Sequence, residues 1–535
     1  MKLEKRCCLM IAPVFLMLLI LPGNRISLAQ WPQASGPFGD FVIEDQEAPA
    51  KWSVILDQNI AWRKALPELG QSSVIASGDR LFFTINQPVN SATTLGSDIL
   101  AYCCNLEDGK TLWTRKISGQ HPLKIASSWG DSSGLAPVTD GKRVAFFYGS
   151  GKISCFDFQG EHLWSREAIP SYRGTPFLVD KRLIYVQMNW APINGGYPSP
   201  KGSLPRSNWT QVQAIDMQTG QPLWSTQCGG NLGSQPLPIQ LKDGRNAFLI
   251  GRGGGHSPPE KPLGISLIDS STGHEIWNLP IDNYHCRQTK PIHNNQALVI
   301  VNDQHWWVDL GSGEVVRRVS LLDDVMVTRK GAEGWVGQRQ SLEKHKKAQV
   351  TDQSNLLVGD FHFFRSYHFN YLGRVNVITG EVEYLQLPTS MLRRRDEMDR
   401  LIWNKEDLPH PIEKTFSVPT ETSYWNFKQN RMVSNSGFQL LGDARSAGNG
   451  WGHYAAPIPT AIGKHLYIPM MNGITFTINW KSYPMDENAL ISINDFGILG
   501  DAWTRSSITF SQGKLFAQTL CELICIEGQQ NTDKN

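Results

Sequence analysis

The sequence predicts an all-β fold, an eight-bladed β-propeller of four-stranded antiparallel blades whose ring is closed by the N-terminal strand. Two observations carry this prediction: a turn motif with a following aromatic residue recurs along the chain, and a pair of short apolar strands precedes most of its copies. Self-similarity at a period of about 50 residues is typical of propellers and solenoids. Four antiparallel strands in each unit favour the propeller.

The turn motif consists of an Asp or Asn, a Gly three or four residues later, and an aromatic residue four positions beyond that Gly. Asp or Asn caps backbone N–H groups two residues on, and Gly adopts the positive φ that a tight hairpin loop requires. The aromatic side chain then lies on the returning strand and fills the seam between neighbouring sheets. The clear copies are Asn105–Gly109–Trp113, Asp157–Gly160–Trp164, Asp216–Gly220–Trp224 and Asp269–Gly273–Trp277, and the weaker ones are Asp309–Gly313–Arg317 and Asn376–Gly380–Tyr384.

The second repeated element is a Pro or Ser, a short strand, a polar turn and a strongly apolar strand. The apolar strands are expected to be buried on both faces. These elements run from Ser73 to Ile85, Pro137 to Tyr148, Pro176 to Val186, Pro236 to Ile250, Pro291 to Val301, Pro457 to Ile468 and Ser507 to Ala517.

The repeat count gives eight units, with seven as the alternative because units six and seven are degenerate. The seventh unit runs from Pro457 to about Trp503, and the eighth begins at Ser507 and ends after its third strand, near Ile526. The missing fourth strand is supplied by the segment around Trp62, which has the marker aromatic but no partner strands before it. Pairing of the first and last strands removes the exposed edges of an open array.

The first 29 residues have the pattern of a signal peptide. A basic start precedes an apolar run from Leu9 to Leu21, and small residues before Ala29 predict cleavage there. The run has 13 residues, fewer than the ~20 that span a bilayer. We expect export to the periplasm or the medium and no membrane span after cleavage, with an uncleaved anchor as the alternative. Residues 30–535 then form a single propeller domain with an insertion at about 388–454.

The charge balance excludes nucleic acid as an expected partner. The whole chain has a formal net charge of +2, and removal of residues 1–29 takes away four basic groups and one acid, which leaves −1. Such a chain lacks the basic surface that binds phosphate backbones.

The stretches Asp216–Trp224 (DMQTGQPLW) and Asp269–Trp277 (DSSTGHEIW) resemble the repeat of the PQQ-like, or quinoprotein-type, β-propeller family. The resemblance covers residues 55–385 and 455–527. It implies one of two functional classes. Quinoprotein dehydrogenases hold pyrroloquinoline quinone (PQQ) and Ca²⁺ on the propeller axis and oxidise alcohols or sugars. Other members keep the repeat without the cofactor, and this chain looks closer to these, which include the propeller lipoprotein of the outer-membrane barrel-assembly machinery.

The adjacent Cys103 and Cys104 are the feature that points to the dehydrogenases, because alcohol-oxidising members carry an adjacent Cys pair above PQQ. Here the pair directly precedes Asn105 and falls on the third strand of a blade. Adjacent Cα atoms, about 3.8 Å apart, are too close for an unstrained disulfide. We favour two strand cysteines on opposite faces, with a bridge as the alternative.

No catalytic residue or metal ligand is assigned from the sequence. The calcium ligands of the dehydrogenases match no motif, and Cys-x-x-Cys-His does not occur. Since a repeat scaffold does not itself determine function, the prediction is a binding or scaffold module without a cofactor. A PQQ-dependent dehydrogenase with PQQ and Ca²⁺ is the alternative.

Long connections favour one face of the ring as the binding surface. Second-to-third-strand loops and interblade links share one face, and the third-to-fourth-strand turns, expected to be uniformly tight, lie on the other. Binding residues commonly lie on loops carried by a rigid scaffold. The long segments assigned to the first class are Asn86–Ser97, Trp190–Thr210, Gly251–Leu263, Met471–Asn488, 114–134, 318–352 and the insertion at 388–454.

Residues before each innermost strand are expected to surround the mouth of a central channel on that face. In the sharper hypothesis, three arginines of this group converge and bind an anionic ligand or an acidic partner segment; in the simpler one, all are solvated loop residues. The expected partner is a protein, or a small anionic or carbohydrate ligand. The candidate residues are Gln71, Trp129, Arg173, Asn231, Arg287, His453 and Arg505.

Overall fold

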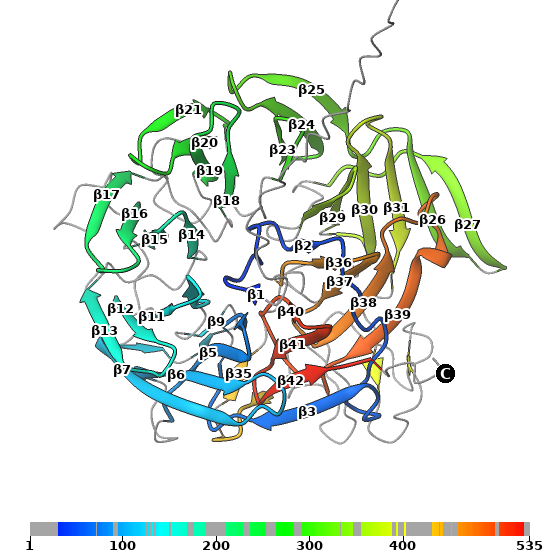
Figure 1. The fold of residues 1–535 in the computed structure, drawn as a ribbon. Coiled ribbons are helices and arrows are strands. Elements are labelled where there is room, and N and C mark those ends of the chain that lie inside the picture. The colour runs from blue at the N-terminus through cyan, green and yellow to red at the C-terminus, as the bar shows by residue number, and fades with distance from the viewer. Residues whose placement is uncertain are drawn as a thin grey trace, which may run out of the picture.

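Eight antiparallel sheets form a ring in the computed structural model (Figure 1). The predicted eight-bladed propeller is confirmed. The structure describes residues 30–70, 72–88, 95–124, 126–127, 130–131, 135–148, 151–167, 176–188, 210–227, 236–252, 264–282, 291–331, 333–345, 355–366, 368–387, 392–393, 401–402, 431–437, 439–441, 451, 457–497 and 502–528.

Blades 1 to 4 each run from the innermost to the outermost strand in chain order. Their strands are β4 (Ile75–Ser77), β5 (Arg80–Asn86), β6 (Leu95–Asn105) and β7 (Thr111–Lys124) in blade 1; β10 (Val138–Thr139), β11 (Arg143–Tyr148), β12 (Lys152–Asp157) and β13 (His162–Glu167) in blade 2; β14 (Phe177–Val179), β15 (Arg182–Met188), β16 (Thr210–Asp216) and β17 (Pro222–Gln227) in blade 3; and β18 (Leu237–Gln240), β19 (Asn246–Arg252), β20 (Gly264–Asp269) and β21 (Glu275–Leu279) in blade 4.

Blades 5 to 8 follow the same order, except that the outermost strand of blade 8 comes from the N-terminal part of the chain. Their strands are β22 (Ile292–His293), β23 (Gln296–Val301), β24 (Gln304–Asp309) and β25 (Val315–Ser320) in blade 5; β28 (Leu356–Val358), β29 (Phe361–Arg365), β30 (Tyr371–Asn376) and β31 (Val382–Gln386) in blade 6; β36 (Thr460–Ile462), β37 (His465–Pro469), β38 (Ile474–Asn479) and β39 (Leu490–Asp495) in blade 7; and β40 (Thr509–Ser511), β41 (Lys514–Gln518), β42 (Glu522–Ile526) and β3 (Ile60–Ala65) in blade 8.

Shorter elements supplement the blades. Within the described residues, none is a helix long and apolar enough to cross a membrane. They are β1 (Gln30–Trp31), β2 (Val42–Ile43), β8 (Ala126–Ser127), β9 (Gly130–Asp131), β26 (Val325–Gly331), β27 (Gly334–Gln340), β32 (Leu392–Arg393), β33 (Leu401–Ile402), β34 (Arg431–Val433), β35 (Gln439–Leu441) and the 3-10 turn η5 (Glu487–Ala489).

The ring closes through antiparallel pairing of β3 with β42, as the sequence predicts. The register runs from Ile60 opposite Ile526 to Ala65 opposite Glu522. Arg63 donates from Nε and Nη2 to the two carboxylate oxygens of Glu522, at 2.9 and 2.8 Å. One strand from the N-terminal part of the chain and the last described strand are therefore held in one sheet.

At seven of the eight seams between blades, a backbone carbonyl at the same position of the turn motif accepts a hydrogen bond. The residue after the Asp or Asn of each third-to-fourth-strand turn accepts a hydrogen bond from the preceding blade, at 2.8–3.2 Å. Marker tryptophans donate at five seams, and residues of the third strands β24 and β30 donate at two. The donor and acceptor residues are Trp62 and Leu106, Trp113 and Phe158, Trp164 and Met217, Trp224 and Ser270, Trp277 and Leu310, Trp307 and Val377, and Arg374 and Trp480.

The motif glycines make room for the marker side chains. Gly273 has a φ of +74°, and a Cβ atom there would lie 2.4 Å from the ring of Trp224. The same packing recurs at Gly109, Gly160, Gly220 and Gly313, against Trp62, Trp113, Trp164 and Trp277. Both properties favour glycine, because a Cβ would meet the ring and L residues rarely adopt this φ.

The weaker copies of the motif differ from one another. Arg317 occupies the marker position against Gly380, stacks 4.6 Å from the ring centroid of Trp307, and donates to the Ile378 carbonyl at 2.8 Å. Tyr384 does not fill the next seam as expected. Its hydroxyl donates to the Leu321 carbonyl at 2.6 Å, while Arg374 makes the bond to blade 7.

The seam between blades 7 and 8 is different because blade 8 has no third-to-fourth-strand turn. Residues 48–58 lie along it instead. Ser53 Oγ donates to Asp495 Oδ2 at 2.6 Å, and the Ile55 amide donates to Asp495 Oδ1 at 3.0 Å. Tyr467 donates its hydroxyl to the Pro49 carbonyl at 2.9 Å.

Two expectations about connections are wrong. In blade 7 the Pro469–Ile474 connection is a short turn, and the long segment from Trp480 to Ala489, with η5, is a third-to-fourth-strand connection. The 471–488 segment therefore does not belong to the loop-rich face, and the third-to-fourth turns are not uniformly tight. The 318–352 link contains the hairpin β26–β27, which extends the outer edge of blade 6.

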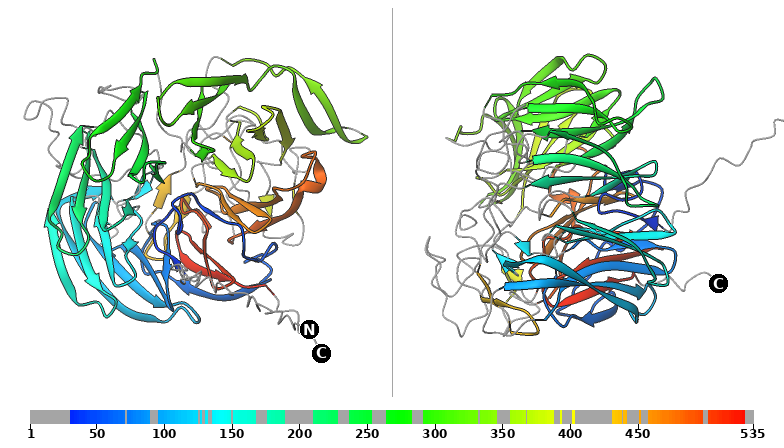
Figure 2. Two further views of the ribbon diagram at one scale, coloured as in Figure 1. Left: turned by 45° about the horizontal axis from the view of Figure 1, so that its top comes forward. Right: turned by 90° about the vertical axis from the view of Figure 1, so that its left-hand side faces the viewer.

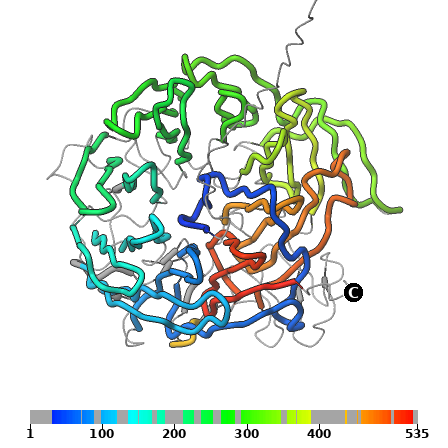
Figure 3. Tube along the Cα trace, in the orientation of Figure 1, coloured from blue at the N-terminus to red at the C-terminus, as the bar shows by residue number. Residues whose placement is uncertain are grey.

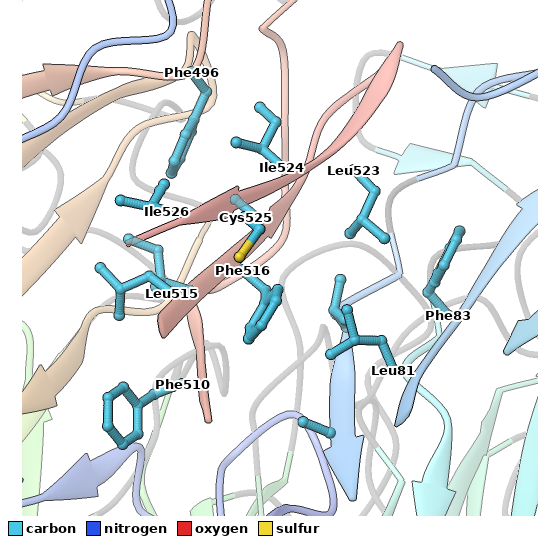
Figure 4. Packing of buried hydrophobic residues seen from close by; sticks show 14 of the residues in the cluster. Leu81, Phe83, Phe496, Phe510, Leu515, Phe516, Leu523, Ile524, Cys525 and Ile526 are labelled. Atoms are coloured by element: carbon cyan, nitrogen blue, oxygen red, sulfur yellow. The ribbon is translucent and has the colours of Figure 1, made fainter. Parts of the chain in front are cut away.

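Apolar side chains fill the space between blades. Between blades 8 and 1, residues of β41 and β42 lie on one side and Leu81 and Phe83 of β5 on the other (Figure 4). Leu515, Ile524 and Leu81 are fully buried. These contacts, repeated around the ring, hold the blades in fixed positions.

Candidate functional site

The N-terminal segment crosses the middle of the ring (Figure 1). β1 pairs with β4 of blade 1, and β2 pairs in parallel with β36 of blade 7. Between them, the Pro32 carbonyl accepts from the Thr139 amide of blade 2 at 2.9 Å, and Gln33 Oε1 accepts from the Leu178 amide of blade 3 at 2.8 Å. We call residues 30–43 the N-terminal strap.

The strap lies on the face of the tight first-to-second-strand turns. It pairs with Ser77, directly before the turn at Gly78, and with Ile462, directly before the turn at Gly463. In the Cα trace, the residues that come after the strap run outward from the middle of the ring to β3 (Figure 3). The repeat pattern does not predict the strap. Its local signal in the sequence is the pair Gly36 and Gly39, and both glycines have a positive φ in the structure.

Polar side chains join the inner strands of blades 8 and 1. Gln518 accepts from Ser72 Oγ at 3.2 Å and donates to the Thr84 carbonyl at 3.0 Å. Thr504 donates its hydroxyl to the Gln518 carbonyl at 2.6 Å, and Ser506 donates to the Ser72 carbonyl at 3.0 Å. Since buried polar groups require partners, this network fixes the link that leads into β40.

Arg505 lies within that link, between Thr504 and Ser506, and is half-buried. Of the seven candidate residues at the channel mouth, it is the one that the structure describes. The other six lie outside the described residues, so the convergence of the three arginines stays a prediction. These six are Gln71, Trp129, Arg173, Asn231, Arg287 and His453.

The described parts of the 388–454 insertion attach at two distant points. Asn435 Nδ2 donates to the carbonyl oxygens of Leu66 and Cys521, both at 2.8 Å. Leu66 follows β3 and Cys521 precedes β42, so the Asn435 side chain bridges the two strands that close the ring. Near the other end, Trp451 is buried and donates to the Tyr371 carbonyl at 2.8 Å. Trp403 and Trp425 of the same insertion lie outside the described residues.

Two buried histidines meet between blades 5 and 6. His305 Nε2 and His362 Nδ1 are 2.8 Å apart, and both side chains are fully buried. Burial lowers the pKa of both histidines, that of His362 to about 3. Both rings are therefore neutral at physiological pH. Sequence reasoning missed the pair because its members are 57 positions apart.

Cys103 and Cys104 are free thiols in β6. Cys103 packs with Phe82 and Trp113, and Cys104 packs with Leu81 and other residues on the opposite face of the blade. The expectation of two strand cysteines on opposite faces is confirmed. Burial raises the pKa of Cys103 to about 12 and that of Cys104 to about 11.

The position of the cysteine pair gives no support to a cofactor bound on the propeller axis. The cysteine pair lies in the third strand of a blade, away from the middle of the ring (Figure 1). Over the part of the chain that the structure describes, no three His, Cys, Asp or Glu side chains gather into a metal-binding group.

Comparison with known proteins gives the family. A family model described as outer membrane protein assembly factor BamB matches residues 96–382, more than half of the chain. No curated protein sequence matches.

Similar solved structures come from both functional classes. BamB from Moraxella catarrhalis is 13% identical, with a TM-score of 0.45, covering 88% of this chain and 98% of that one. A europium-containing methanol dehydrogenase is 12% identical, with a TM-score of 0.47, covering 92% and 89%. The quinohemoprotein alcohol dehydrogenase ADHIIG from Pseudomonas putida HK5 is 10% identical, with a TM-score of 0.47, covering 95% and 81%.

These likenesses do not decide between the two classes. The family match, together with the repeated turn motif and the ring of eight four-stranded blades, assigns the chain to a family. The chain belongs to the PQQ-like β-propeller family whose model is described as outer membrane protein assembly factor BamB.

Proposed function

We propose that the protein is an exported binding scaffold that recognises a protein partner through its loop-rich face. The observation that carries this proposal is the placement of the strap. It occupies the middle of the tight-turn face, where it contacts blades 1, 2, 3 and 7. The opposite face is left to carry the long connections.

The long connections leave and re-enter the blades at the same end. They join Asn86 to Leu95, Met188 to Thr210 and Arg252 to Gly264. Each follows a second strand, so antiparallel pairing places all three at the end opposite the first-to-second-strand turns. Variable loops on a rigid frame are the usual location of binding residues.

Export and a protein partner are supported by two further observations. The first 29 residues have the pattern of a signal peptide. The matching family model is named for outer membrane protein assembly, which is a process that involves other proteins. We therefore place the protein in the periplasm or outside the cell.

Site-specific photo-crosslinking tests the proposed face. Glu167 ends β13 on the loop-rich side of blade 2, and Gln159 lies in the third-to-fourth-strand turn of the same blade; both are exposed. A photo-reactive residue at 167 should give discrete adducts with a partner in intact cells, and one at 159 should not. Equal adducts at both positions would contradict the proposed face.

The dehydrogenase alternative has its own measurement. The purified protein is titrated with PQQ and Ca²⁺ and then supplied with alcohols or sugars and an electron-accepting dye. We expect no saturable absorbance change and no dye reduction. Saturable binding with substrate-dependent dye reduction would replace the scaffold proposal by the quinoprotein one.

A further inference from the structure

The hairpin β34–β35 of the insertion at 388–454 lies at one face of the ring, as the side view shows (Figure 2, right). The turn that joins its two strands is closed by a hydrogen bond from the Gly437 amide to the Ser434 carbonyl, at 2.9 Å. Asn435 and Ser436 are therefore the two central residues of this turn, and they form the tip of the hairpin.

The side chain of Asn435 meets the closing sheet of blade 8 at the loop-rich end of its strands. Leu66 follows β3, and Cys521 precedes β42. The Leu66 amide donates to the Cys521 carbonyl at 2.8 Å, directly beyond the sheet. A side-chain amide has two N–H donors, and Asn435 directs one to each of the carbonyl oxygens of these two residues, both at 2.8 Å. One side chain therefore holds both strands.

Ser436 makes a second contact with the same part of the chain. Its hydroxyl donates to the carboxylate of Glu68, a buried residue. The other carboxylate oxygen of Glu68 accepts from the Leu69 amide at 2.7 Å. Burial of a carboxylate is costly unless its oxygens are hydrogen-bonded. The tip of the hairpin supplies one of these hydrogen bonds.

Blade 8 differs from the other blades in the connection of its outer strands. In blades 1 to 7 the third strand continues through one connection into the fourth, whereas in blade 8 the fourth strand, β3, precedes the rest of the ring in the chain. When β3 and β42 separate, no short connection keeps them close, so they gain more conformational freedom than the outer strands of another blade. An additional restraint therefore has its largest effect on this sheet.

We propose that the hairpin β34–β35 is a clasp that keeps the ring closed. In the docked state its tip binds the Leu66 carbonyl after β3, the Cys521 carbonyl before β42, and the carboxylate of Glu68. Release of the tip removes these three hydrogen bonds at the loop-rich end of the closing sheet, and β3 then separates from β42 more often. This role does not depend on the partner proposed for the loop-rich face.

The side chains at the tip suit the groups that they contact. Two carbonyl oxygens and a carboxylate accept hydrogen bonds, and the side chains of asparagine and serine supply N–H and O–H donors. An aspartate at position 435 would have no donor, and its negative charge would face the same oxygen atoms. The clasp therefore requires donation by Asn435 and not only the shape of its side chain.

Hydrogen–deuterium exchange of the folded full-length protein tests the clasp. The Leu66 amide reports on the closing sheet, and the Leu321 amide, which donates to the Asp303 carbonyl at 2.8 Å, reports on blade 5. Asn435→Ala should make the Leu66 amide exchange roughly tenfold faster, because two hydrogen bonds that oppose local opening are lost. The Leu321 amide should keep its rate. An unchanged rate at Leu66, or equal acceleration at both amides, would overturn the proposal.

Gln512→Ala is the matched control. Gln512 donates from its side-chain amide to the Gly78 carbonyl at 2.8 Å, so it also links blade 8 to blade 1, but through the first-to-second-strand turns. The Leu66 amide should exchange at the wild-type rate in this variant. A rate as fast as in Asn435→Ala would show that the loss of any such bond loosens the closing sheet, and the clasp would be overturned.

Asn435→Asp separates donation from shape. The aspartate has nearly the same size, but it presents oxygen atoms to the carbonyls of Leu66 and Cys521. It should therefore speed the exchange of the Leu66 amide more than Asn435→Ala does. Asn435 is exposed, so both variants should fold, with the circular dichroism of the wild type. Exchange at the wild-type rate in Asn435→Asp would contradict the clasp.

Discussion

The indole ring of Trp62 lies against the backbone of Gly109, with 2.7 Å between the ring and the position that a Cβ atom would take. Trp62 belongs to the strand that completes blade 8, and Gly109 belongs to the outer turn of blade 1. This contact joins the closing sheet to the first sheet. The same relationship between a tryptophan and a glycine is repeated around the next four seams.

The seam glycines should tolerate no side chain. Gly273→Ala places a methyl group 2.4 Å from the Trp224 ring at a φ of +74°, which adds overpacking of about 1–3 kcal/mol to backbone strain of about 1–2 kcal/mol. Urea unfolding monitored by circular dichroism measures the loss.

Gly244→Ala is the matched control, because Gly244 has a φ of +86° but nothing within 4 Å of a new Cβ. The Gly244→Ala variant should lose only the part of the stability that backbone strain costs. Equal losses in the two variants would show that the contact with Trp224 has no effect.

Deletion of the strap should expose particular amides. The Thr139, Ala461 and Gly463 amides donate to the carbonyls of Pro32, Phe41 and Ile43. Without residues 30–43, these three amides should exchange faster in hydrogen–deuterium exchange of the folded protein, measured by mass spectrometry. Local opening of the structure sets the rate of this exchange. The Leu241 amide, which donates to Arg245, should keep its rate.

The cysteines of β6 should be unreactive in the native protein. Burial raises the pKa of Cys103 to about 12 and that of Cys104 to about 11, so neither thiolate forms at pH 8, and the thiolate is the reactive species. Labelling with a maleimide, read by peptide mass spectrometry, should occur only after unfolding. Labelling that also requires a reductant would reveal a bridge between them.

The buried histidine pair should make stability depend on pH. Unfolded histidines bind protons below about pH 6.5, whereas burial lowers the pKa of His362 in the folded state to about 3. The unfolded state therefore binds more protons in this window, and stability falls as the pH falls through it. The expected slope is up to about 1.4 kcal/mol per pH unit for each histidine.

Urea unfolding between pH 7 and pH 4 measures this slope. His362→Gln should flatten it, and His274→Gln, at an exposed turn, should not. Identical slopes in the two variants would assign the acid sensitivity to other groups.

The repeated parts of the fold could be predicted from the sequence. Asp216, Gly220 and Trp224 predict a turn, a positive φ and a seam contact because each requirement is local and recurs at a fixed spacing. The closing role of Trp62 follows from the same pattern, since a marker without its own strands needs partners elsewhere. Arg317 keeps the marker role because its guanidinium fills the same space.

The unrepeated parts could not be predicted in the same way. Tyr384 matches the motif, yet Arg374, from the neighbouring strand, makes the seam contact. The strap and the hairpin β26–β27 depend on pairing with strands distant in the chain, which no local spacing encodes. The prediction of the mouth residues rests only on their positions before the inner strands, and Arg505 is the one among them that the structure describes.

Closure by β3 and β42 also sets the order in which the ring can assemble. Arg63 and Glu522, paired across it, are 459 positions apart, and contacts at such separation form late and slowly. During synthesis from the N-terminus, β3 is made long before β42 and stays without its partner strand until the chain has passed Glu522. Truncation before Glu522 would leave β3 without that strand, so the ring closes only in a chain that extends beyond this residue.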